Sequence, residues 1–376
     1  MATLTTTSLS KSFGKTRAID DISLDIGDGE FFVILGPSGA GKTTTLKSVA
    51  GLVDVDRGSV RIAGRSMDGV EPYQRNVAMA FESYALYPQR TVSQNLASPL
   101  RSGRSGRYSE AEQKQRIELV TTTLGIDHLL RRFPRELSNG QRQRVALGRV
   151  LVRPADVYLL DEPLSHLDAK LRAAMRSELK QLGAMSSTTS LYVTHDYQEA
   201  LALGDRIAVL REGRLVQVGT PLEVWHEPVD TFVAKALGQP EINLVDAEVD
   251  GGVLRAAGGA LEVPVPRDSG LAAGDRARIG IRPRDVELGR GAEPATDHLR
   301  VRGEVRLHER LGREIELTVD IGGVQLVAVA PGAEQVTEGD AVDLDVPLGK
   351  THVFAAGAPG EDTARIGAPT VPGRNR

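Results

Sequence analysis

One short segment of the sequence has the residue types and the spacing of a loop that binds phosphate groups. It runs from Gly36 to Thr43 and follows the pattern G-x-x-x-x-G-K-[ST]. Glycines let backbone N–H groups turn toward phosphate oxygens, and the N-terminus of a following helix adds a favourable dipole. The lysine can reach the β- and γ-phosphates of a nucleotide, and the last hydroxyl can bind Mg²⁺. The residues expected to contact a nucleotide are Gly36, Pro37, Ser38, Gly39, Ala40, Gly41, Lys42, Thr43 and Thr44.

The segments on either side of this loop fit the same role. Residues 31–35 are all apolar, as in a strand buried on both faces of a parallel sheet, and residues 44–50 can continue as a helix. The order of strand, glycine-rich turn and helix makes the motif more specific than its letters alone. The alternative is a glycine-rich turn that binds nothing, and the context favours the nucleotide site.

Two acidic residues follow a second apolar run. Residues 157–160 are Val-Tyr-Leu-Leu, and Asp161 and Glu162 come directly after them. Ligands of α/β proteins bind at the carboxyl edge of the sheet, where such residues lie. Successive strand residues point to opposite sides, so one carboxylate can bind a metal ion while the other accepts a proton from water. We therefore expect Asp161 and Thr43 to be ligands of Mg²⁺ and Glu162 to be a general base.

The elements around these residues predict an α/β domain over residues 1–236. Apolar runs alternate with helical patterns there, which is typical of a mostly parallel sheet in a P-loop nucleotidase fold. The apolar runs that we expect to form strands are 31–35, 157–160, 191–193 and 207–210. Strand patterns stop between about 88 and 150, where we expect a helical subdomain with an exposed basic loop at 101–107.

The pattern changes after Leu237. Short alternating runs separated by glycines predict a small antiparallel, barrel-like β domain over residues 237–356. Residues 357–376 are rich in Pro, Gly and Ala and have little periodicity, so we expect a disordered tail there.

The composition disfavours several classes of protein. The net charge of −4 argues against a protein that binds by neutralising nucleic-acid phosphates, so we expect no nucleic-acid partner. The absence of cysteine excludes a disulfide framework and a thiolate metal site. No window is long and apolar enough for a membrane span, so we expect any membrane association to run through a partner.

A third motif stands before a long helical pattern. Residues 137–141 read Leu-Ser-Asn-Gly-Gln, and Ser138 with Gln141 fits the S-x-x-Q capping box of a helix N-terminus. Capping alone would explain these two residues. The order of the motifs along the chain, however, resembles that of an ATP-binding-cassette (ABC) ATPase. These motifs are the phosphate loop, Leu-Ser-Asn-Gly-Gln (137–141), Leu-Leu-Asp-Glu-Pro (159–163), Ser-His-Leu-Asp (165–168) and Thr-His-Asp (194–196).

Two further segments narrow the resemblance to the carbohydrate-importer branch of the maltose-transporter type, over residues 3–356. They are Phe-Glu-Ser-Tyr-Ala-Leu-Tyr-Pro at 81–88 and Gly-Ile-Arg-Pro at 280–283. The resemblance implies an ATPase subunit that binds ATP and Mg²⁺ and drives import of a carbohydrate or polyol. It also implies a peripheral position on the cytoplasmic face of the membrane, permease subunits as partners, and an external solute-binding protein as an indirect one. A second ATPase subunit, identical or different, would complete a dimer.

The resemblance also assigns roles to further residues. It implies that Ser138, Gly140 and Gln141 bind ATP held by the other subunit, and that Asp168 organises the interface between the subunits. His195 would bind the γ-phosphate and the attacking water, and its position after a strand-like run favours this over a purely structural role. Phe13 would stack on adenine, although a packed aromatic near an edge strand is an alternative.

One residue departs from the family pattern at a site of chemistry. Glu82 stands where the family has a glutamine that contacts Mg²⁺ and water. A carboxylate can still bind Mg²⁺, but it adds negative charge near the γ-phosphate. This motivates a second hypothesis, a nucleotide-sensing or slow-turnover subunit of a heterodimeric importer. A third, a cassette ATPase that does not transport, is disfavoured by the single cassette and the β domain.

Glu82→Gln is therefore expected to raise the basal ATPase rate. At an effective dielectric constant of 20, two unit charges about 5 Å apart repel by roughly 3 kcal/mol, which is enough to slow turnover. The gain is expected to be largest at high pH, where protonation cannot neutralise Glu82. Rates of wild type and variant, measured across pH and Mg²⁺ concentration on a verified homodimer, test this. An unchanged or lower rate in the variant would show that Glu82 does not act as a brake.

Overall fold

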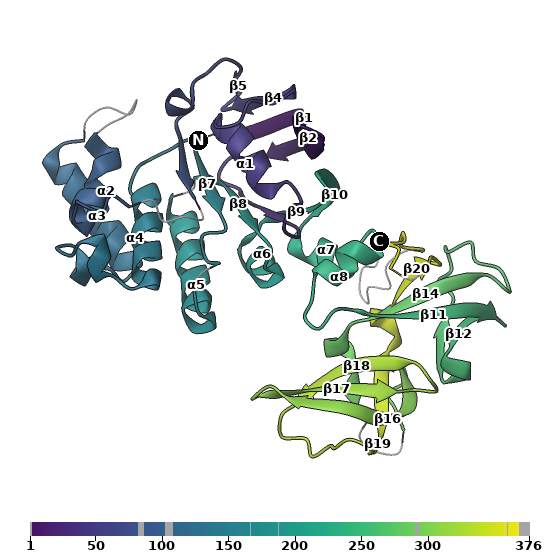
Figure 1. Cartoon of the computed structure of the whole chain (residues 1–376). Coiled ribbons are helices and arrows are strands. Elements are labelled where there is room, and N and C mark those ends of the chain that lie inside the picture. Colours follow the sequence, from purple (N-terminus) through teal and green to yellow (C-terminus); the bar gives the residue numbers. More distant parts are fainter. Residues whose placement is uncertain are drawn as a thin grey trace. The chain divides into compact units, whose positions relative to one another are not determined.

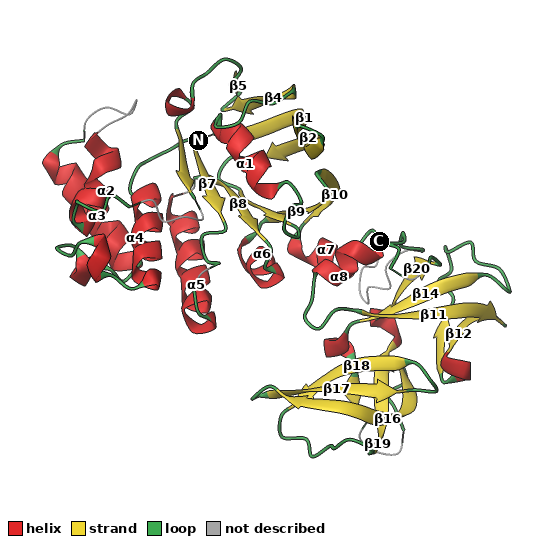
Figure 2. Ribbon diagram, viewed as in Figure 1, coloured by secondary structure: helices red, strands yellow, loops and turns green. Residues whose placement is uncertain are grey.

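The computed structural model describes residues 2–81, 86–101, 108–165, 167–186, 188–289, 293–358 and 360–367. The chain divides into two compact units, Met1–Pro221 and Leu222–Arg376. Figure 1 follows the chain through both, and Figure 2 distinguishes their helices from their strands. In the described part of the chain, no helix combines the length and the apolar character that crossing a membrane requires.

A six-stranded sheet in the order β10-β9-β3-β8-β7-β6 forms the centre of the first unit (Figure 1). Its strands from β9 to β6 are parallel, and β10 is antiparallel to β9. Every residue of β7 and β8 is buried, which explains why, apart from Asp161, both strands consist of apolar, aromatic or small polar residues. The predicted parallel sheet is confirmed. Its strands are β3 (Phe31–Leu35), β6 (Val77–Ala80), β7 (Val157–Asp161), β8 (Thr189–Thr194), β9 (Arg206–Arg211) and β10 (Arg214–Gly219).

The first unit also contains a four-stranded antiparallel sheet that the sequence did not predict. Along the chain, two of its strands come before β3 and the other two lie between β3 and β6. Its order is β2-β1-β4-β5, with β1 (Leu4–Phe13), β2 (Thr16–Ile26), β4 (Arg57–Ile62) and β5 (Arg65–Ser66). Leu4 of β1 and Ile62 of β4 are fully buried in the same hydrophobic cluster as Phe32 of β3 and Leu46 of the following helix. The two sheets therefore share one core.

Helices supply the rest of the first unit. They are α1 (Lys42–Ala50), α2 (Val92–Arg101), α3 (Glu110–Thr123), α4 (Asn139–Leu151), α5 (Ala169–Ser186) and α6 (Tyr197–Leu203). Between them, α2, α3 and α4 occupy the expected helical segment (Figure 2). They pack closely at Gly148, where a Cβ would lie 3.2 Å from side-chain atoms of Leu96 and Leu124. Most of the basic loop expected at 101–107 lies outside the described residues.

The described residues of the second unit form two short α-helices, three single-turn 3-10 helices and two five-stranded sheets in which every strand pair is antiparallel. Alternating exposure along β17, whose every second side chain is buried, matches the alternating sequence pattern. The first sheet has the order β13-β12-β11-β14-β20, with β11 (Asn243–Asp250), β12 (Val253–Ala256), β13 (Leu261–Pro264), β14 (Arg276–Ile281) and β20 (His352–Ala355). The second has the order β15-β19-β16-β17-β18, with β15 (Glu287–Leu288), β16 (His298–Arg310), β17 (Glu314–Asp320), β18 (Gln325–Pro331) and β19 (Ala341–Pro347). The helices are α7 (Pro221–His226) and α8 (Thr231–Ala236).

The division between the units falls earlier than the sequence predicted. The expected boundary after residue 236 lies behind α8, whereas the structure divides after Pro221. Arg282 is 3% exposed, and its guanidinium donates hydrogen bonds to the carbonyl oxygens of Trp225 and Leu237. Ala234 of α8 packs in one cluster with Phe354 of β20. Helices α7 and α8 therefore belong with the β-rich unit, although their sequence pattern resembles that of the preceding α/β unit.

The expectation of a disordered tail from residue 357 is wrong for residues 360–367. Ala355 N donates to Ala364 O, and Ile366 N donates to Val353 O, at 2.8 Å each. On its other side the segment pairs with the residues that precede α8, because Arg365 N donates to Val229 O. Strand β20 is the edge of its sheet, and its free backbone groups provide partners that composition does not reveal. Residues 368–376 lie outside the described residues.

A chain that ends after Pro221 is expected to fold and bind ATP, whereas one that ends after Ala236 is expected to be less stable. The longer chain keeps α7 and α8, whose Val224 and Val233 are fully buried, without the β sheets that belong to the same unit. Thermal unfolding by circular dichroism and ATP affinity of both chains test this. Equal melting temperatures of the two chains would mean that α7 and α8 can belong to the first unit, as the boundary at residue 236 predicts.

Candidate functional site

The glycine-rich loop connects the end of β3 to the start of α1 at the carboxyl edge of the central sheet. Gly41 has a φ of 97°, and a Cβ on it would lie 2.4 Å from Ala18 O, so only glycine fits. Pro37, Ser38 and Gly39 are exposed at the turn, while Thr44 lies in the first turn of α1. The exposed turn and the N-terminus of α1 make a concave set of backbone donors suited to an anion.

The amine of Lys42 lies at the mouth of this loop. Its Nζ donates hydrogen bonds to Gly36 O at 2.9 Å and to Pro37 O at 3.0 Å. A third contact, 3.5 Å long, joins Nζ to Oε1 of Glu162. The side chain is only 5% exposed, so its charge is held at one place rather than moving through solvent. A fixed, largely desolvated cation beside the loop is suited to bind phosphate oxygens.

Thr43 and Asp161 bring two oxygen donors together from different elements. The hydroxyl Oγ1 of Thr43, at the start of α1, donates to Oδ1 of Asp161, at the end of β7, over 2.8 Å. Mg²⁺ prefers hard oxygen ligands and commonly takes one or two from the protein and the rest from phosphates and water. This pair of donors fits such a site. Among the described residues, no group of three or more His, Cys, Asp or Glu could hold a metal by itself.

Glu162 and His195 meet at the end of β7 and β8. Nδ1 of His195 lies 2.8 Å from Oε2 of Glu162. The backbone of Glu162 has a φ of 43°, an uncommon value for a residue with a Cβ, and its N–H donates to Val193 O on β8. This turn directs the Glu162 carboxylate toward Lys42 on one side and His195 on the other. The histidine side chain is 55% exposed and so can also reach a ligand.

A buried polar cluster lies behind His195. The hydroxyls of Tyr192 and Thr194, both on β8, donate to Oε2 of Glu199 on α6, each over 2.8 Å. Burial raises the pKa of the Glu199 carboxyl, although these two hydrogen bonds act in the opposite direction. Asp196 follows His195 and caps α6, because its Oδ1 accepts from Gln198 N. The backbone on both sides of His195 is thus held by side-chain hydrogen bonds.

Among the described residues, no hydrogen bond or ion pair joins Ser138, Gln141 or Asp168 to this cluster. Ser138 and Gln141 form the expected capping box at the start of α4, with Ser138 N donating to Oε1 of Gln141 at 3.0 Å. A Cβ on Gly140 would lie 2.9 Å from Leu171 Cδ2, so glycine lets α4 approach α5. Asp168 caps α5 by accepting a hydrogen bond from Leu171 N at 2.9 Å. Their roles toward a second subunit stay predictions.

Phe13 lies at the end of β1 and is 52% exposed, with Lys11 Nζ 5.6 Å from the centre of its ring. The alternative of a packed aromatic is therefore not what the structure shows. An exposed ring is available for stacking, but its role toward adenine stays a prediction. Glu82 lies outside the described residues, so its proposed metal contact also stays a prediction from sequence.

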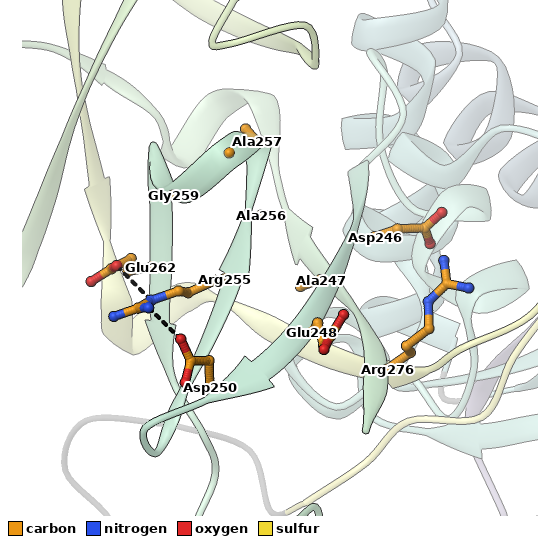
Figure 3. A pocket seen from close by; sticks show the side chains of 11 residues that line it. Asp246, Ala247, Glu248, Asp250, Arg255, Ala256, Ala257, Gly259, Glu262 and Arg276 are labelled. Atoms are coloured by element: carbon orange, nitrogen blue, oxygen red, sulfur yellow. Dashed lines mark hydrogen bonds and ion pairs between the residues drawn. The ribbon is translucent and has the colours of Figure 1, made fainter. Parts of the chain in front are cut away.

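A separate groove lies in the second unit and is lined by charged residues of β11 to β14 (Figure 3). Arg255 of β12 is paired with Asp250 and with Glu262 of β13, as the dashed lines mark. The charged lining residues are Asp246, Glu248, Asp250, Arg255, Glu262 and Arg276. The surplus of carboxylates disfavours a phosphate ligand, so this groove is no second candidate for the nucleotide.

Two further charged residues, Arg172 and Glu199, lie near the site and belong to none of the sequence motifs. Arg172 of α5 contacts Asp196 and lies 3.9 Å from Glu199, measured from Nε to Oε1. The only signal in the sequence is that Arg172 follows Asp168 by four residues, which places both on one side of a helix start. Glu199 follows the buried strand β8 by five residues, and nothing in its pattern distinguishes it from a surface residue.

Comparison with known families finds two matches in this chain. The family model described as ABC transporter matches residues 19–165, and the model described as TOBE domain matches residues 279–354. The first covers the glycine-rich loop and the acidic pair Asp161 and Glu162 at the end of β7. The second falls within the β-rich unit.

Curated relatives match almost the whole chain. A xylose/arabinose import ATP-binding protein, XacK of Haloferax volcanii, is 42% identical, and the match covers 94% of each chain. A trehalose/maltose import ATP-binding protein, MalK of Thermococcus litoralis, is 44% identical over 92% of this chain and 95% of its own. An sn-glycerol-3-phosphate import ATP-binding protein, UgpC 2 of Rhizobium johnstonii, is 41% identical over 94% of this chain and 97% of its own.

Solved structures match the first unit. The dimeric structure of MJ0796, a bacterial ABC transporter cassette, aligns with a TM-score of 0.54 and 28% identity. The match covers 58% of this chain and 98% of that one. A post-hydrolysis state of the same cassette, bound to ADP and Pi, aligns with a TM-score of 0.53 and 27% identity.

Proposed function

This chain belongs to the ATP-binding subunits of ABC importers, and from that premise we propose that it powers the uptake of a carbohydrate or a related polyol. Membership follows from relatives that are 41–44% identical over nearly the whole chain. The proposed solute class rests on the names of those relatives, which are ATP-binding proteins for the import of xylose/arabinose, trehalose/maltose or sn-glycerol-3-phosphate. The solute itself would meet the permease and the binding protein, not this subunit.

One observation carries the proposed chemistry: the side chains of Lys42, Thr43, Asp161, Glu162 and His195 converge at one edge of the central sheet. Lys42 and the backbone N–H groups of the loop would bind the β- and γ-phosphates of ATP. Thr43 and Asp161 would hold Mg²⁺, which supplies positive charge that offsets the charge of the phosphates.

Glu162 and His195 would act on the attacking water. Glu162 would accept a proton, and the 2.8 Å contact with His195 supports this role because it orients the Glu162 carboxylate. The exposed side of the His195 ring is free to contact the γ-phosphate or the water. The two residues therefore form a base and its orienting partner, an arrangement that recurs in hydrolytic sites.

A second ATPase subunit would complete the site. The similarity to a dimeric cassette supports this, as does the exposure of Ser138 at the N-terminus of α4, where it is available to another chain. Permease subunits would hold the dimer at the cytoplasmic face of the membrane. Glu82 favours one further possibility, in which this chain pairs with a different, faster ATPase subunit.

The proposal is tested at two levels. The purified protein is expected to hydrolyse ATP in the presence of Mg²⁺ and to lose that activity with EDTA. A strain without this chain is expected to lose uptake of one labelled pentose, disaccharide or glycerol phosphate, and to regain it with the wild-type chain. ATP hydrolysis without any uptake defect across these solutes would rule out the proposed solute class, while leaving the ATPase in place.

A further inference from the structure

Arg172, in the first turn of α5, contacts the two loops that carry the hydrolytic residues. Its Nη2 donates to Leu167 O at 3.1 Å and lies 3.5 Å from Ser165 O, both in the loop that follows Glu162. Its Nη1 pairs with Oδ2 of Asp196 at 3.2 Å, directly after His195. The guanidinium touches neither Glu162 nor His195 in the structure, so any effect on them must pass through these loops.

On the Glu162 side, a short chain of hydrogen bonds runs from Arg172 through Ser165 to the backbone of Glu162. Ser165 Oγ donates to Glu162 O at 2.9 Å, and Ser165 N donates to the same oxygen at 3.2 Å. The Ser165 and Leu167 carbonyls in turn accept from Arg172. The turn that gives Glu162 its positive φ is therefore closed by Ser165 and held from behind by Arg172.

The contact on the His195 side is equally direct. Asp196 uses one carboxylate oxygen to cap α6 and the other to pair with Arg172. Asp196 N donates to Thr194 Oγ1, which itself donates to buried Glu199. The residues on both sides of His195 thus belong to one network of hydrogen bonds and ion pairs. Among the described contacts, Arg172 is the only cation in that network.

We propose that Arg172 is a positioning residue that holds the loop of Glu162 and the loop of His195 in the register that brings Glu162 Oε2 and His195 Nδ1 together. The proposal rests on the proposed roles of that pair in ATP hydrolysis. A guanidinium suits the task because its planar set of donors can serve carbonyls and a carboxylate at once, in fixed directions. A lysine amine could keep the ion pair with Asp196 but not the parallel contacts to the carbonyls.

The test compares Arg172→Gln and Arg172→Lys with a matched control. Arg176→Gln changes an arginine one turn later on α5, whose Nη1 also reaches α6, at Gln198 Oε1 over 3.4 Å, but which contacts neither loop. ATP affinity is measured with a fluorescent nucleotide, turnover by phosphate release and folding by thermal unfolding. Arg172→Gln is expected to lower kcat by about 10- to 100-fold, the scale of a small misplacement of catalytic groups, while changing ATP affinity less than about twofold.

Arg172→Lys is expected to recover part of the loss, because it keeps the charge opposite Asp196. Combining Arg172→Gln with Asp196→Asn is expected to lower kcat no further than Arg172→Gln alone, since both remove the same contact. Equal kcat in Arg172→Gln and Arg176→Gln would overturn the proposal. So would a loss of ATP affinity as large as the loss of kcat. If the wild-type protein does not hydrolyse ATP at all, the proposed function fails first and this inference fails with it.

Discussion

Glu162→Gln is expected to lower ATP turnover by about 10²- to 10⁴-fold, the usual contribution of a general base, while ATP binding is retained. The amide is nearly the same size as the carboxylate and can still lie beside His195, but it cannot accept a proton from water. The side chain is 18% exposed and faces Lys42 at 3.5 Å, so removal of its charge also leaves the lysine freer to bind phosphate. ATP affinity is therefore expected to stay equal or to rise.

Phosphate release and equilibrium binding of a fluorescent ATP analogue separate the two effects. Glu118→Gln, an exposed glutamate on α3, makes the same chemical change away from the site and is expected to behave as wild type. Turnover near the wild-type rate in Glu162→Gln would remove this residue from the role of base. Loss of both turnover and binding would indicate that Glu162 holds the loop together rather than activating water.

Lys42→Ala is expected to weaken ATP binding by about 10- to 100-fold, because a hydrogen bond between charged groups contributes roughly 1.5–3 kcal/mol. The substitution removes the one side-chain cation that the described structure places against Glu162 beside the loop. It also leaves the carbonyls of Gly36 and Pro37 without their donor, which loosens the loop that must meet the phosphates. Turnover at low ATP concentration is expected to fall by at least as much.

The matched control is Lys47→Ala, which removes a lysine from the last turn of the same helix. Isothermal titration with ATP and with ADP measures the loss, which is expected to be larger for ATP because the amine is placed for the terminal phosphates. Thermal unfolding of both variants shows whether the loop or the whole unit is affected. Unchanged ATP affinity in Lys42→Ala would mean that the backbone donors alone hold the nucleotide.

Much of the fold could be predicted because buried segments have characteristic patterns of apolar residues. The four runs at 31–35, 157–160, 191–193 and 207–210 became β3, β7, β8 and β9, since strands buried on both faces must be apolar throughout. The antiparallel sheet of β1, β2, β4 and β5 was missed because its strands face the core on one side only and are rich in polar residues. A weak alternation of this kind is easily lost among turns.

The boundary between the two units and the pairing of residues 360–367 could not be predicted for a different reason. The helical pattern of residues 222–236 does not indicate which unit they join. In the structure, α7 and α8 contact Arg282 of the second unit, about 50 residues further along the chain. Residues 360–367 pair with the edge of β20 through backbone groups, which every sequence possesses. In both cases the deciding partner is distant in sequence, so local composition carries no information about it.

By itself, the sequence determined that this chain has a phosphate loop, an acidic pair at a strand end and a histidine after another strand. Local patterns suffice for these features because a turn next to the phosphates and a strand buried on both sides constrain each residue directly. Only the tertiary structure decided which contacts join Lys42, Thr43 and His195 to Asp161 and Glu162, and that Arg172 joins the loops behind them. These contacts depend on the order of strands in the sheet, which brings the ends of β3, β7 and β8 together. That order cannot be inferred from the sequence of any single segment.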